Sequence, residues 1–241
     1  MIEIHHVRDE ENLRRAYEDI YGSAGIRHTD SFYHWILGLI GPQPGKRFLD
    51  IACGQGVLPV LAASRGLEAH GLDLSAYAVK LGLGQDADLL VANGENLPYS
   101  ENSFHYVTNI GSLEHYVDPV AGIREISRVL SHDGRACILL PNTFSLLGNV
   151  LYAWHNGRTA DDGQPIQRYA ARYEWEAMLE AGGLSVIRTH KYECEFPRSL
   201  GDLALYLQRP KSLLRLVLSP FVPLNLANSF VYTCKKGNLQ A

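Results

Sequence analysis

Two acidic residues flank a pair of glycines in the first third of the chain. Asp50 stands just before Gly54 and Gly56, and Asp73 follows this strand by about twenty residues, the spacing at which a nucleoside-binding βαβ unit places its ribose-binding acid. Glycine lets the backbone turn sharply and lets a ligand approach the main chain closely. A carboxylate at Asp50 would repel a pyrophosphate, but it suits an ammonium group. The pattern therefore favours a nucleoside ligand that carries an ammonium group.

The elements that position these residues alternate between strand and helix. Apart from Asp50, residues 48–51 are apolar, and turn residues bound them, which predicts a short buried strand. Residues 57–65 read as a helix with Pro59 in its first turn, where the missing N–H costs nothing. A second strand, Glu68–Asp73, follows. Free N–H groups at the start of such a helix favour a negatively charged ligand group.

The two motifs resemble those of a known family. The run D-I-A-C-G-Q-G from Asp50, followed by G-L-D-L-S around Asp73, resembles motifs I and II of the class I S-adenosylmethionine-dependent methyltransferases and is similar to their small-molecule (methyltransferase-11-like) branch. The resemblance implies an α/β, Rossmann-like fold, whose mixed seven-stranded sheet has the order 3-2-1-4-5-7-6 and helices on both faces. It also implies S-adenosyl-L-methionine as cofactor and methyl transfer to a small-molecule acceptor. Specific motifs cover residues 46–142; residues 170–195 and 229–237 match by pattern only.

The resemblance assigns roles to individual residues. Gly54 and Gly56 would line the methionine part of the cofactor, Asp50 would help to hold its amino group, and Asp73 would accept hydrogen bonds from both ribose hydroxyls. Asn93 stands where the family usually has an aspartate on the adenine amino group, and its carbonyl can accept the same bond as a neutral, weaker partner. The expected cofactor-binding residues are Asp50, Ala52, Cys53, Gly54, Gly56, Asp73, Leu74, Asn93, Gly94, Glu95, Asn109 and Ile110.

His115 is the expected catalytic residue. The run L-E-H-Y-V-D-P that contains it resembles the family segment that closes over the sulfonium end, which would place His115 near the methyl group. Imidazole has an unperturbed pKa near neutrality, so it suits a general base, which is needed only where the acceptor atom carries a proton of high pKa. A structural or lid histidine is the alternative interpretation.

Other functions stay open at this point. An NAD-dependent oxidoreductase shares the strand, glycine turn and helix, but its G-x-G-x-x-G would need a glycine where Pro59 stands, and Asp50 would oppose the pyrophosphate. A non-catalytic S-adenosylmethionine-binding or regulatory module fits too, because no acceptor-specific motif is visible. The N-P-P-Y type signature of amino-methylating nucleic-acid enzymes is missing after Asn109. The acceptor and its O, N or C nucleophile are not identified.

Composition narrows the class of protein. The chain has 241 residues, of which 46% are hydrophobic and 20% charged, so we expect one globular domain with a sizeable core. The net charge of −4 gives no reason to expect nucleic-acid binding. No apolar run is long enough to span a bilayer, and the N-terminus lacks the apolar region of a signal peptide. Four scattered cysteines predict buried thiols in a reducing cytoplasm, and no histidine spacing supports a metal site.

The single domain has three regions outside the core pattern. Residues 1–45 are expected to form a helical lid, with helices at 7–20 and 29–39, and Tyr17, Tyr21 and His28 are either lid contacts or ordinary surface residues. Residues 143–169 and 197–228 are expected to be cap insertions over the active site. Ser131 to Gly134 read as a turn before the fifth strand.

The second cap insertion allows two interpretations. It is rich in leucine and punctuated by Arg198, Arg209, Lys211 and Arg215. Its apolar side chains either pack on the first insertion and wall an apolar or anionic acceptor, or form a basic amphipathic surface that rests on a membrane or on a second subunit of a homodimer. The first is favoured, because ligand sites are mostly apolar with a few placed polar groups.

Overall fold

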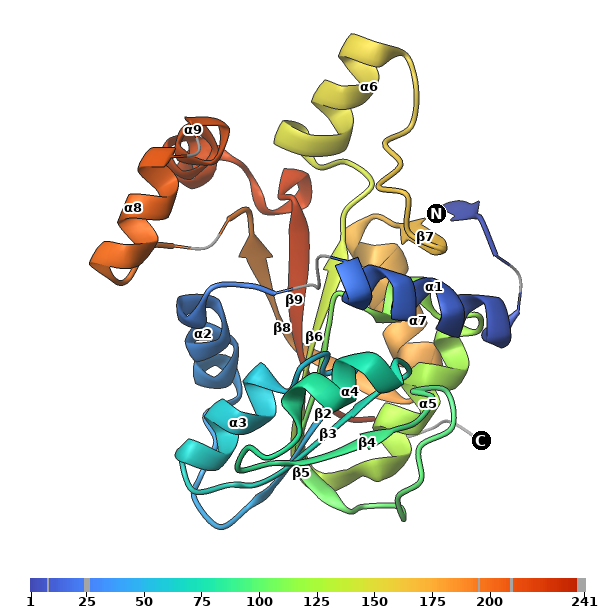
Figure 1. Ribbon diagram of the computed structural model, residues 1–241. Helices are drawn as coiled ribbons and strands as arrows, with labels where there is room; N and C mark the ends of the chain where they lie inside the picture. The colour runs from blue at the N-terminus through green and yellow to red at the C-terminus, as the bar shows by residue number, and fades with distance from the viewer. Residues whose placement is uncertain (8, 24–26, 195, 209, 238–241) are drawn as a thin grey trace.

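The computed structural model describes residues 1–241 except 8, 24–26, 195, 209 and 238–241. A seven-stranded sheet in the order β4-β3-β2-β5-β6-β9-β8 forms its centre (Figure 1). Only β9 is antiparallel to its neighbours. The expected mixed sheet and its strand order are therefore confirmed. The strands are β2 (Arg47–Ile51), β3 (Glu68–Asp73), β4 (Asp88–Val91), β5 (Phe104–Ile110), β6 (Leu130–Pro141), β8 (Leu184–Tyr192) and β9 (Ser229–Lys236).

Helices cover both faces of the sheet. On one face, α2 (Asp30–Ile40) and α3 (Val57–Ser64) bury Ile36 and Leu58 against β2 and β6. On the other face, α5 (Pro119–Val129) and α7 (Arg172–Ala181) bury Ile123 and Trp175. The short helix α4 (Ala76–Gly82) packs beside β3 and β4, and α1 (Glu10–Ser23) packs on α4. Both apolar faces of the sheet are thus removed from water, the dominant favourable contribution to folding.

Side chains at the helix starts explain where the helices begin. The Thr29 hydroxyl accepts from the Phe32 N–H at 3.4 Å, and the Ser75 hydroxyl accepts from the Ala78 N–H at 3.1 Å. Such caps satisfy donors that the helix itself leaves free. The first helix was predicted from residue 7, but it begins at Glu10, because Asp9 accepts from the Asn12 N–H at 2.9 Å.

The predicted turn at Ser131 to Gly134 is wrong. These residues belong to β6, which runs unbroken from Leu130 to Pro141. Leu130 pairs with Phe104, and the next pairs resume at Arg135 opposite Tyr106, so the polar residues between them form an irregularity in the ladder. Turn-forming residues inside a strand often mark such a bulge.

A second, two-stranded sheet was not expected. β1 (Ile2–His5) pairs antiparallel with β7 (Ile166–Tyr169), so the N-terminal region is not wholly helical. β7 is buried along its whole length, whereas β1 alternates between exposed and half-buried residues. The end of the first predicted insertion therefore belongs to the body of the protein, next to the short 3-10 helix η1 (Leu113–His115).

Both cap insertions stand above the carboxyl ends of the strands (Figure 1). The first follows β6 and forms the π-helical turn η2 (Leu146–Val150) and α6 (Leu151–Asn156). The second follows β8 and forms α8 (Leu200–Gln208), α9 (Pro210–Leu218) and the 3-10 turns η3 (Ser219–Phe221) and η4 (Leu224–Leu226). None of the helices in the described residues is long and apolar enough to cross a bilayer.

The cysteines lie in the core or at its margin and form no disulfide. Cys137 on β6 and Cys234 on β9 are buried, and burial raises the pKa of both thiols. Cys53 and Cys194 are half-buried, which only partly fits the expectation of buried thiols. The described residues contain no cluster of three His, Cys, Asp or Glu side chains able to hold a metal ion.

Candidate functional site

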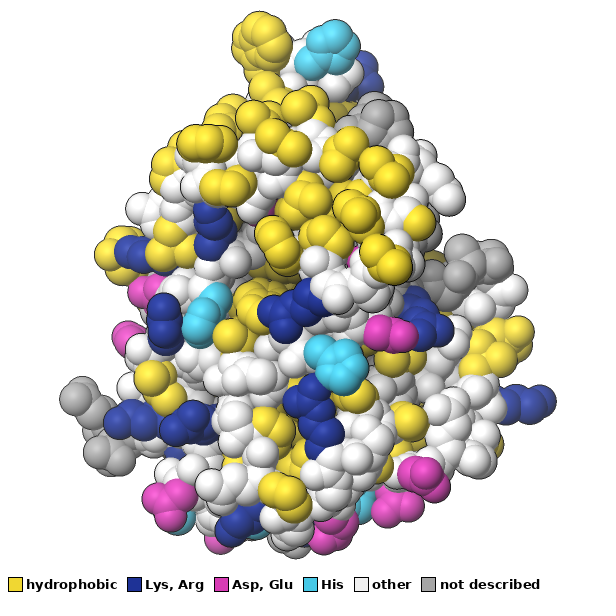
Figure 2. Space-filling view, turned by 90° about the vertical axis from the view of Figure 1, so that its left-hand side faces the viewer, with side chains coloured by type: hydrophobic (Ala, Val, Ile, Leu, Met, Phe, Trp, Pro, Cys, Tyr) yellow, Lys and Arg dark blue, Asp and Glu magenta, His cyan; other side chains and the backbone are white. Residues whose placement is uncertain are grey.

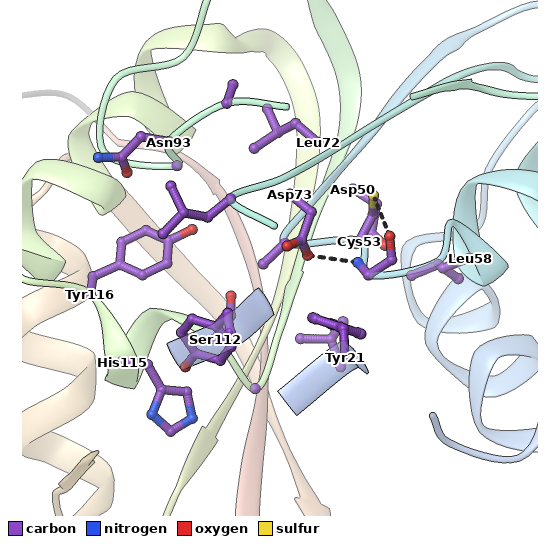
Figure 3. Close-up of a pocket in the computed structure, with 18 of the residues that line it drawn as sticks. Tyr21, Asp50, Cys53, Leu58, Leu72, Asp73, Asn93, Ser112, His115 and Tyr116 are labelled. Carbon is purple, nitrogen blue, oxygen red and sulfur yellow. Dashed lines mark hydrogen bonds between the residues drawn. The ribbon is translucent and has the colours of Figure 1, made fainter. Parts of the chain in front are cut away.

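A cavity lies between α1 and the carboxyl ends of the central strands (Figure 3). It is lined by all the expected cofactor-binding residues except Gly56 and Asn109, and by His115. The lid residues Tyr17, Tyr21 and His28 line it as well. The lining residues without a predicted role are Leu13, Tyr33, Leu58, Leu72, Ala92, Gly111, Ser112, Tyr116 and Gln164.

The glycine turn after β2 brings the backbone to the cavity wall. Ala52, Gly54 and Gly56 have φ angles of 60°, 56° and 77°, in the left-handed region. Glycine adopts this region freely, whereas Ala52 does so at a cost that is common at functional turns. A Cβ at Gly54 would lie 2.8 Å from the Tyr21 hydroxyl oxygen, so this glycine admits a lid side chain. Gly56 instead lies against the Leu89 side chain, where a Cβ would approach to 2.7 Å, so its glycine serves packing.

Asp73 ties the glycine turn to the start of α4. Its Oδ2 accepts from the Gly54 N–H at 2.8 Å, and its Oδ1 accepts from the Ser75 N–H at 2.9 Å. A carboxylate offers about four acceptor sites, so about two remain for a ligand. Burial raises the pKa of Asp73, although the two N–H donors oppose that rise. The residue is therefore held in place and can still accept from two hydroxyls.

Asp50 is buried on β2, the strand next to β3, and has no cationic partner among the described residues of the cavity wall. Its Oδ1 accepts from the Thr108 hydroxyl at 2.6 Å. Burial raises the pKa of Asp50 to about 7, with the Thr108 hydrogen bond opposing and the charge of Asp73 adding to the rise. Among the described residues, no lysine or arginine lines the cavity. A ligand with a positive charge would therefore find two buried carboxyl groups and no competing cation.

The expected adenine loop follows β4. The Asn93 side-chain oxygen accepts from the Glu95 N–H at 2.9 Å, which uses part of the acceptor capacity expected for a nucleobase. Glu95 lines the cavity, but its carboxylate accepts from the Val117 N–H at 2.8 Å and so holds the loop to the segment after η1. A Cβ at Gly94 would lie 2.0 Å from the Tyr116 hydroxyl, so this side chain packs directly on the loop.

Asn109 builds the neighbouring turn and does not line the cavity. Its Oδ1 accepts from the Ser112 hydroxyl at 2.9 Å and from the Leu113 N–H at 3.1 Å, and its Nδ2 donates to the Tyr116 hydroxyl at 3.0 Å. Ile110, the next residue, reaches the cavity wall. Asn109 therefore positions η1 and Tyr116.

His115 is buried at the wall of the cavity. Its Nδ1 lies within hydrogen-bonding distance of the Ile166 carbonyl oxygen on β7. A carbonyl only accepts, so Nδ1 carries the proton and Nε2 keeps a lone pair in the neutral ring. Burial lowers the pKa of His115, which favours that neutral form. The geometry thus provides a neutral imidazole of defined tautomer, as a general base requires.

Known proteins can now be compared with this geometry. Residues 49–138 match the family model described as a methyltransferase domain. Over these residues the chain is similar to a methyltransferase domain. Over 99 residues it is 33% identical to demethylmenaquinone methyltransferase from Corynebacterium kroppenstedtii, and the match covers 41% of this chain and 43% of that relative. The chain thus matches less than half the length of this curated relative.

Solved structures show the same fold over nearly the whole domain. A chain from the complex of the Haloferax volcanii Trm112 methyltransferase activator with a putative methyltransferase superposes with a TM-score of 0.65 at 17% identity, covering 98% of this chain and 99% of that one. Geranyl diphosphate methyltransferase, solved with geranyl diphosphate and sinefungin, gives 0.64 at 18% identity, covering 94% and 98%. At such identities the likeness establishes the class I methyltransferase fold.

A contact that the sequence did not reveal holds α1 beside the cavity. Glu18 on α1 accepts from the Ala76 N–H at 2.7 Å, the Tyr77 N–H at 3.0 Å and the Ser75 hydroxyl at 3.0 Å. Its carboxylate therefore caps the start of α4, where the helix dipole favours negative charge. The lid helix is fastened beside the expected ribose-binding acid.

Arg168 on β7 holds the segment that carries His115. Its guanidinium donates to the backbone carbonyls of Glu114 at 3.2 Å and Val117 at 3.3 Å and to that of Tyr116, and it pairs with Glu3 at 2.8 Å. The Arg168 side chain is only 4% exposed. No sequence motif predicts this role of Arg168, because the role depends on the pairing of β7 with β1.

Glu114 is a buried acid beside His115 that had no predicted role. Its Oε1 lies 3.8 Å from Nε2 of His115, and its Oε2 has no hydrogen-bond partner among the described residues. Burial raises the pKa of Glu114 to about 8. The acid is therefore largely protonated near neutrality, and it faces the nitrogen of His115 that carries the lone pair.

Proposed function

We propose that this domain binds S-adenosylmethionine in the cavity and transfers its methyl group to a small-molecule acceptor. One observation carries the proposal: Asp50 and Asp73 are two buried acids at neighbouring strand ends, in a cavity wall whose described residues include no lysine or arginine. Such a site favours a cationic nucleoside and opposes a pyrophosphate. The match of residues 49–138 to a methyltransferase domain supports the same ligand.

The chain's own residues supply binding and orientation. Asp73 would hold the ribose hydroxyls with its remaining acceptor sites, Asp50 the ammonium group, and the turn at Gly54 would let the backbone approach the ligand. When bound, the cofactor supplies an electrophilic methyl group on its sulfonium. The protein must hold the acceptor in line with that group and exclude water, and such positioning can remove roughly 7–11 kcal/mol from a barrier.

His115 would act as general base for an acceptor whose attacking atom carries a proton. Nδ1 donates to the Ile166 carbonyl, so Nε2 would take the proton. The Tyr17 ring lies edge-on to the imidazole, with the ring centres 6.5 Å apart, and helps to keep it from water. An acceptor with a free lone pair would need only the positioning.

A second cavity under the cap is our candidate for the acceptor site. It lies between the start of α2 and the cap helices, has a volume of about 730 Å³, and shares the lining residue His28 with the cofactor cavity. Glu193 at the end of β8 lines it, with Oε1 buried and without a hydrogen-bond partner among the described residues. Nε of Arg215 lies 3.7 Å from that oxygen.

The cap is fastened by specific contacts that would shape this site. The Asn142 side chain, directly after β6, donates to the carbonyls of Asn225 at 2.9 Å and Ala227 at 2.8 Å, which joins the end of β6 to the second insertion. Arg215 donates to the Leu147 carbonyl at 2.8 Å. Among the described residues, however, the lining of the second cavity comes from the second insertion, the end of β8 and the start of α2, and none of it from residues 143–169, so the second insertion would form the acceptor site.

Calorimetry tests the cofactor, and a labelled-methyl assay tests the transfer. We expect S-adenosylmethionine to bind with a micromolar Kd, about −8 kcal/mol, and NAD not to bind. Incubation with methyl-labelled cofactor and fractionated cell extracts should then label a small molecule. If calorimetry detects no binding at millimolar cofactor, the proposed function is wrong. Binding of the cofactor without any methyl transfer would favour a cofactor-binding module.

A further inference from the structure

The cap exposes large apolar side chains at one end of the molecule. Trp154 on α6 is 83% exposed, Leu200 on α8 87% and Phe221 on η3 81%. The other exposed apolar residues of this surface, which we call the cap patch, are Phe144, Val150, Leu151, Tyr152, Phe196, Leu203, Leu207, Leu214, Val217 and Leu218. Figure 2 shows hydrophobic side chains gathered over the upper half of this side. Exposed apolar surface on this scale marks an interaction site.

The two insertions contribute to one continuous surface. Arg215 of α9 donates to the Leu147 carbonyl at 2.8 Å, so α9 lies beside η2 and α6. The groove between them is lined by Leu147, Leu151, Leu214 and Leu218, with Ser212 and Arg215. Four leucines open to solvent at this seam suit aliphatic chains.

Charge is distributed unequally between the cap and the body. The two cap insertions, residues 143–169 and 197–228, have six basic residues against three acidic ones, a net charge of +3; the basic ones are Arg158, Arg168, Arg198, Arg209, Lys211 and Arg215. The whole chain has 22 basic and 26 acidic residues, so the remainder has 16 basic and 23 acidic ones, a net charge of −7. Arg158 and Arg198 are exposed, whereas Arg215 faces the buried Glu193. Arg209 and the Lys211 side chain lie outside the described residues.

We infer that the cap patch docks on the surface of an anionic phospholipid bilayer. An apolar face rich in leucine and aromatic side chains, bordered by basic residues and set on an acidic body, complements the headgroup boundary of such a membrane. The acidic body would be repelled by the same surface, which orients the molecule cap-down. Resting on the proposed function, the acceptor would be an amphiphile of that membrane whose polar end reaches the second cavity beneath α8 and α9, because most of the residues that line this cavity are charged or polar.

Flotation with vesicles of phosphatidylcholine and phosphatidylglycerol tests the surface. We expect the full chain to float with them at low salt, roughly tenfold more tightly than with pure phosphatidylcholine, and to lose that preference at high salt. The variant Trp154→Ser/Leu214→Ser/Phe221→Ser should bind at least about tenfold more weakly, because each lost apolar side chain removes buried area. Arg158→Glu/Arg198→Glu should lose the preference for anionic vesicles.

Two control variants on the body test whether vesicle binding depends on the cap patch or on any exposed apolar or basic residue. Leu83→Ser/Tyr173→Ser changes exposed apolar residues outside the cap, and Lys80→Glu/Arg124→Glu makes the same charge change as the arginine variant. Both should float like the unmodified chain. Equal flotation of cap and body variants, or no flotation at all, overturns the inference. So does a dimer in sedimentation velocity that only the Trp154→Ser/Leu214→Ser/Phe221→Ser variant converts to monomers, because the patch would then join two copies.

Calorimetry with S-adenosylmethionine on the same samples keeps the two proposals apart. If the protein binds the cofactor but not the vesicles, the membrane inference is wrong and the proposed methyltransferase function still holds. If the protein binds vesicles through the cap patch but does not bind the cofactor, the membrane inference is supported and the proposed function is wrong.

Discussion

The backbone N–H of Gly54 donates a 2.8 Å hydrogen bond to Oδ2 of Asp73. This bond joins the glycine turn after β2 to the end of β3, so the two motif residues form one unit. The acid that would bind the ribose also fixes the backbone beside it. Any change at Asp73 should therefore affect both the ligand and the local structure.

Asp73→Ala should weaken S-adenosylmethionine binding far more than Asn93→Ala. Hydrogen bonds to a charged acceptor contribute roughly 1.5–3 kcal/mol each, against about 0.5–1.5 kcal/mol for neutral ones. The Asn93 oxygen also already accepts from the Glu95 N–H. Calorimetric Kd values for both variants test this, with Asp73→Asn as the shape-matched control. A larger loss for Asn93→Ala would mean that the adenine loop is misplaced.

Cofactor affinity should fall as the pH drops below about 7, because burial raises the pKa of Asp50 to about 7. An ammonium group needs the carboxylate, so below that pH binding must first displace a proton. The Kd should then rise by about tenfold per pH unit, since each pKa unit of mismatch corresponds to about 1.4 kcal/mol. Asp50→Asn should bind more weakly with a flat profile. An equally steep profile in that variant would exclude Asp50 as the cause.

The same raised pKa affects the stability of the ligand-free protein. The unfolded carboxyl has a pKa of about 3.9, so between about pH 4 and 7 the folded state holds one more proton than the unfolded state. The contribution of Asp50 to the free energy of unfolding is therefore complete below about pH 4 and is lost as the pH rises through about 7. Urea titrations of the native chain and of Asp50→Asn, compared across this range, should show that difference in slope.

Glu18→Gln should loosen the lid. The neutral side chain loses its attraction to the start of α4, an effect of roughly 0.3–2 kcal/mol at a helix terminus. Because α1 lines the cavity, we expect the cofactor Kd to rise by about three- to tenfold while the sheet keeps its stability. Asp19→Asn, an exposed neighbour on the same helix, is the control. If both variants bind alike, Glu18 does not fasten a functional lid.

Arg168→Met should destabilise the fold much more than Glu3→Gln. The first variant leaves the Glu114 and Val117 carbonyls without their charged donor, and removing one partner of a buried interaction costs about 3–5 kcal/mol. The second removes only a pair whose glutamate side chain is 44% exposed, at about 0–1 kcal/mol. Urea unfolding measures both, and similar losses would show that the carbonyl contacts carry little energy.

The sequence predicted the strand–turn–helix core because its signals are local. The strand Glu68–Asp73 has the expected boundaries, and the helices expected at 57–65 and 29–39 run from Val57 to Ser64 and from Asp30 to Ile40. The family motifs then added the strand order, including the antiparallel β9, which local patterns could not have provided.

The missed features depend on contacts between distant parts of the chain. β1 and β7 are short, and each is recognisable only once its partner is known. Glu18 and Arg168 looked like ordinary charged residues, because the backbone groups they bind come from other elements. Asn109 and Gly56 belong to motifs, yet one builds a turn and the other admits Leu89. The motifs thus predicted where the site lies more reliably than they predicted the role of each residue.

His115→Gln should lower kcat while leaving the cofactor Kd unchanged. Loss of a general base reduces a rate by about 10²- to 10⁴-fold, and glutamine keeps a polar group of similar size that can still donate to the Ile166 carbonyl. Because burial lowers the pKa of His115, the fall of kcat at saturating cofactor on the acid side should lie at a lower pH than the titration of a free imidazole, and it should be absent in the variant. The titration of Asp50 should instead affect the pH dependence of kcat/KM for the cofactor, because Asp50 acts on cofactor binding. A kcat that is unchanged in His115→Gln would leave the imidazole as a structural contact between η1 and β7.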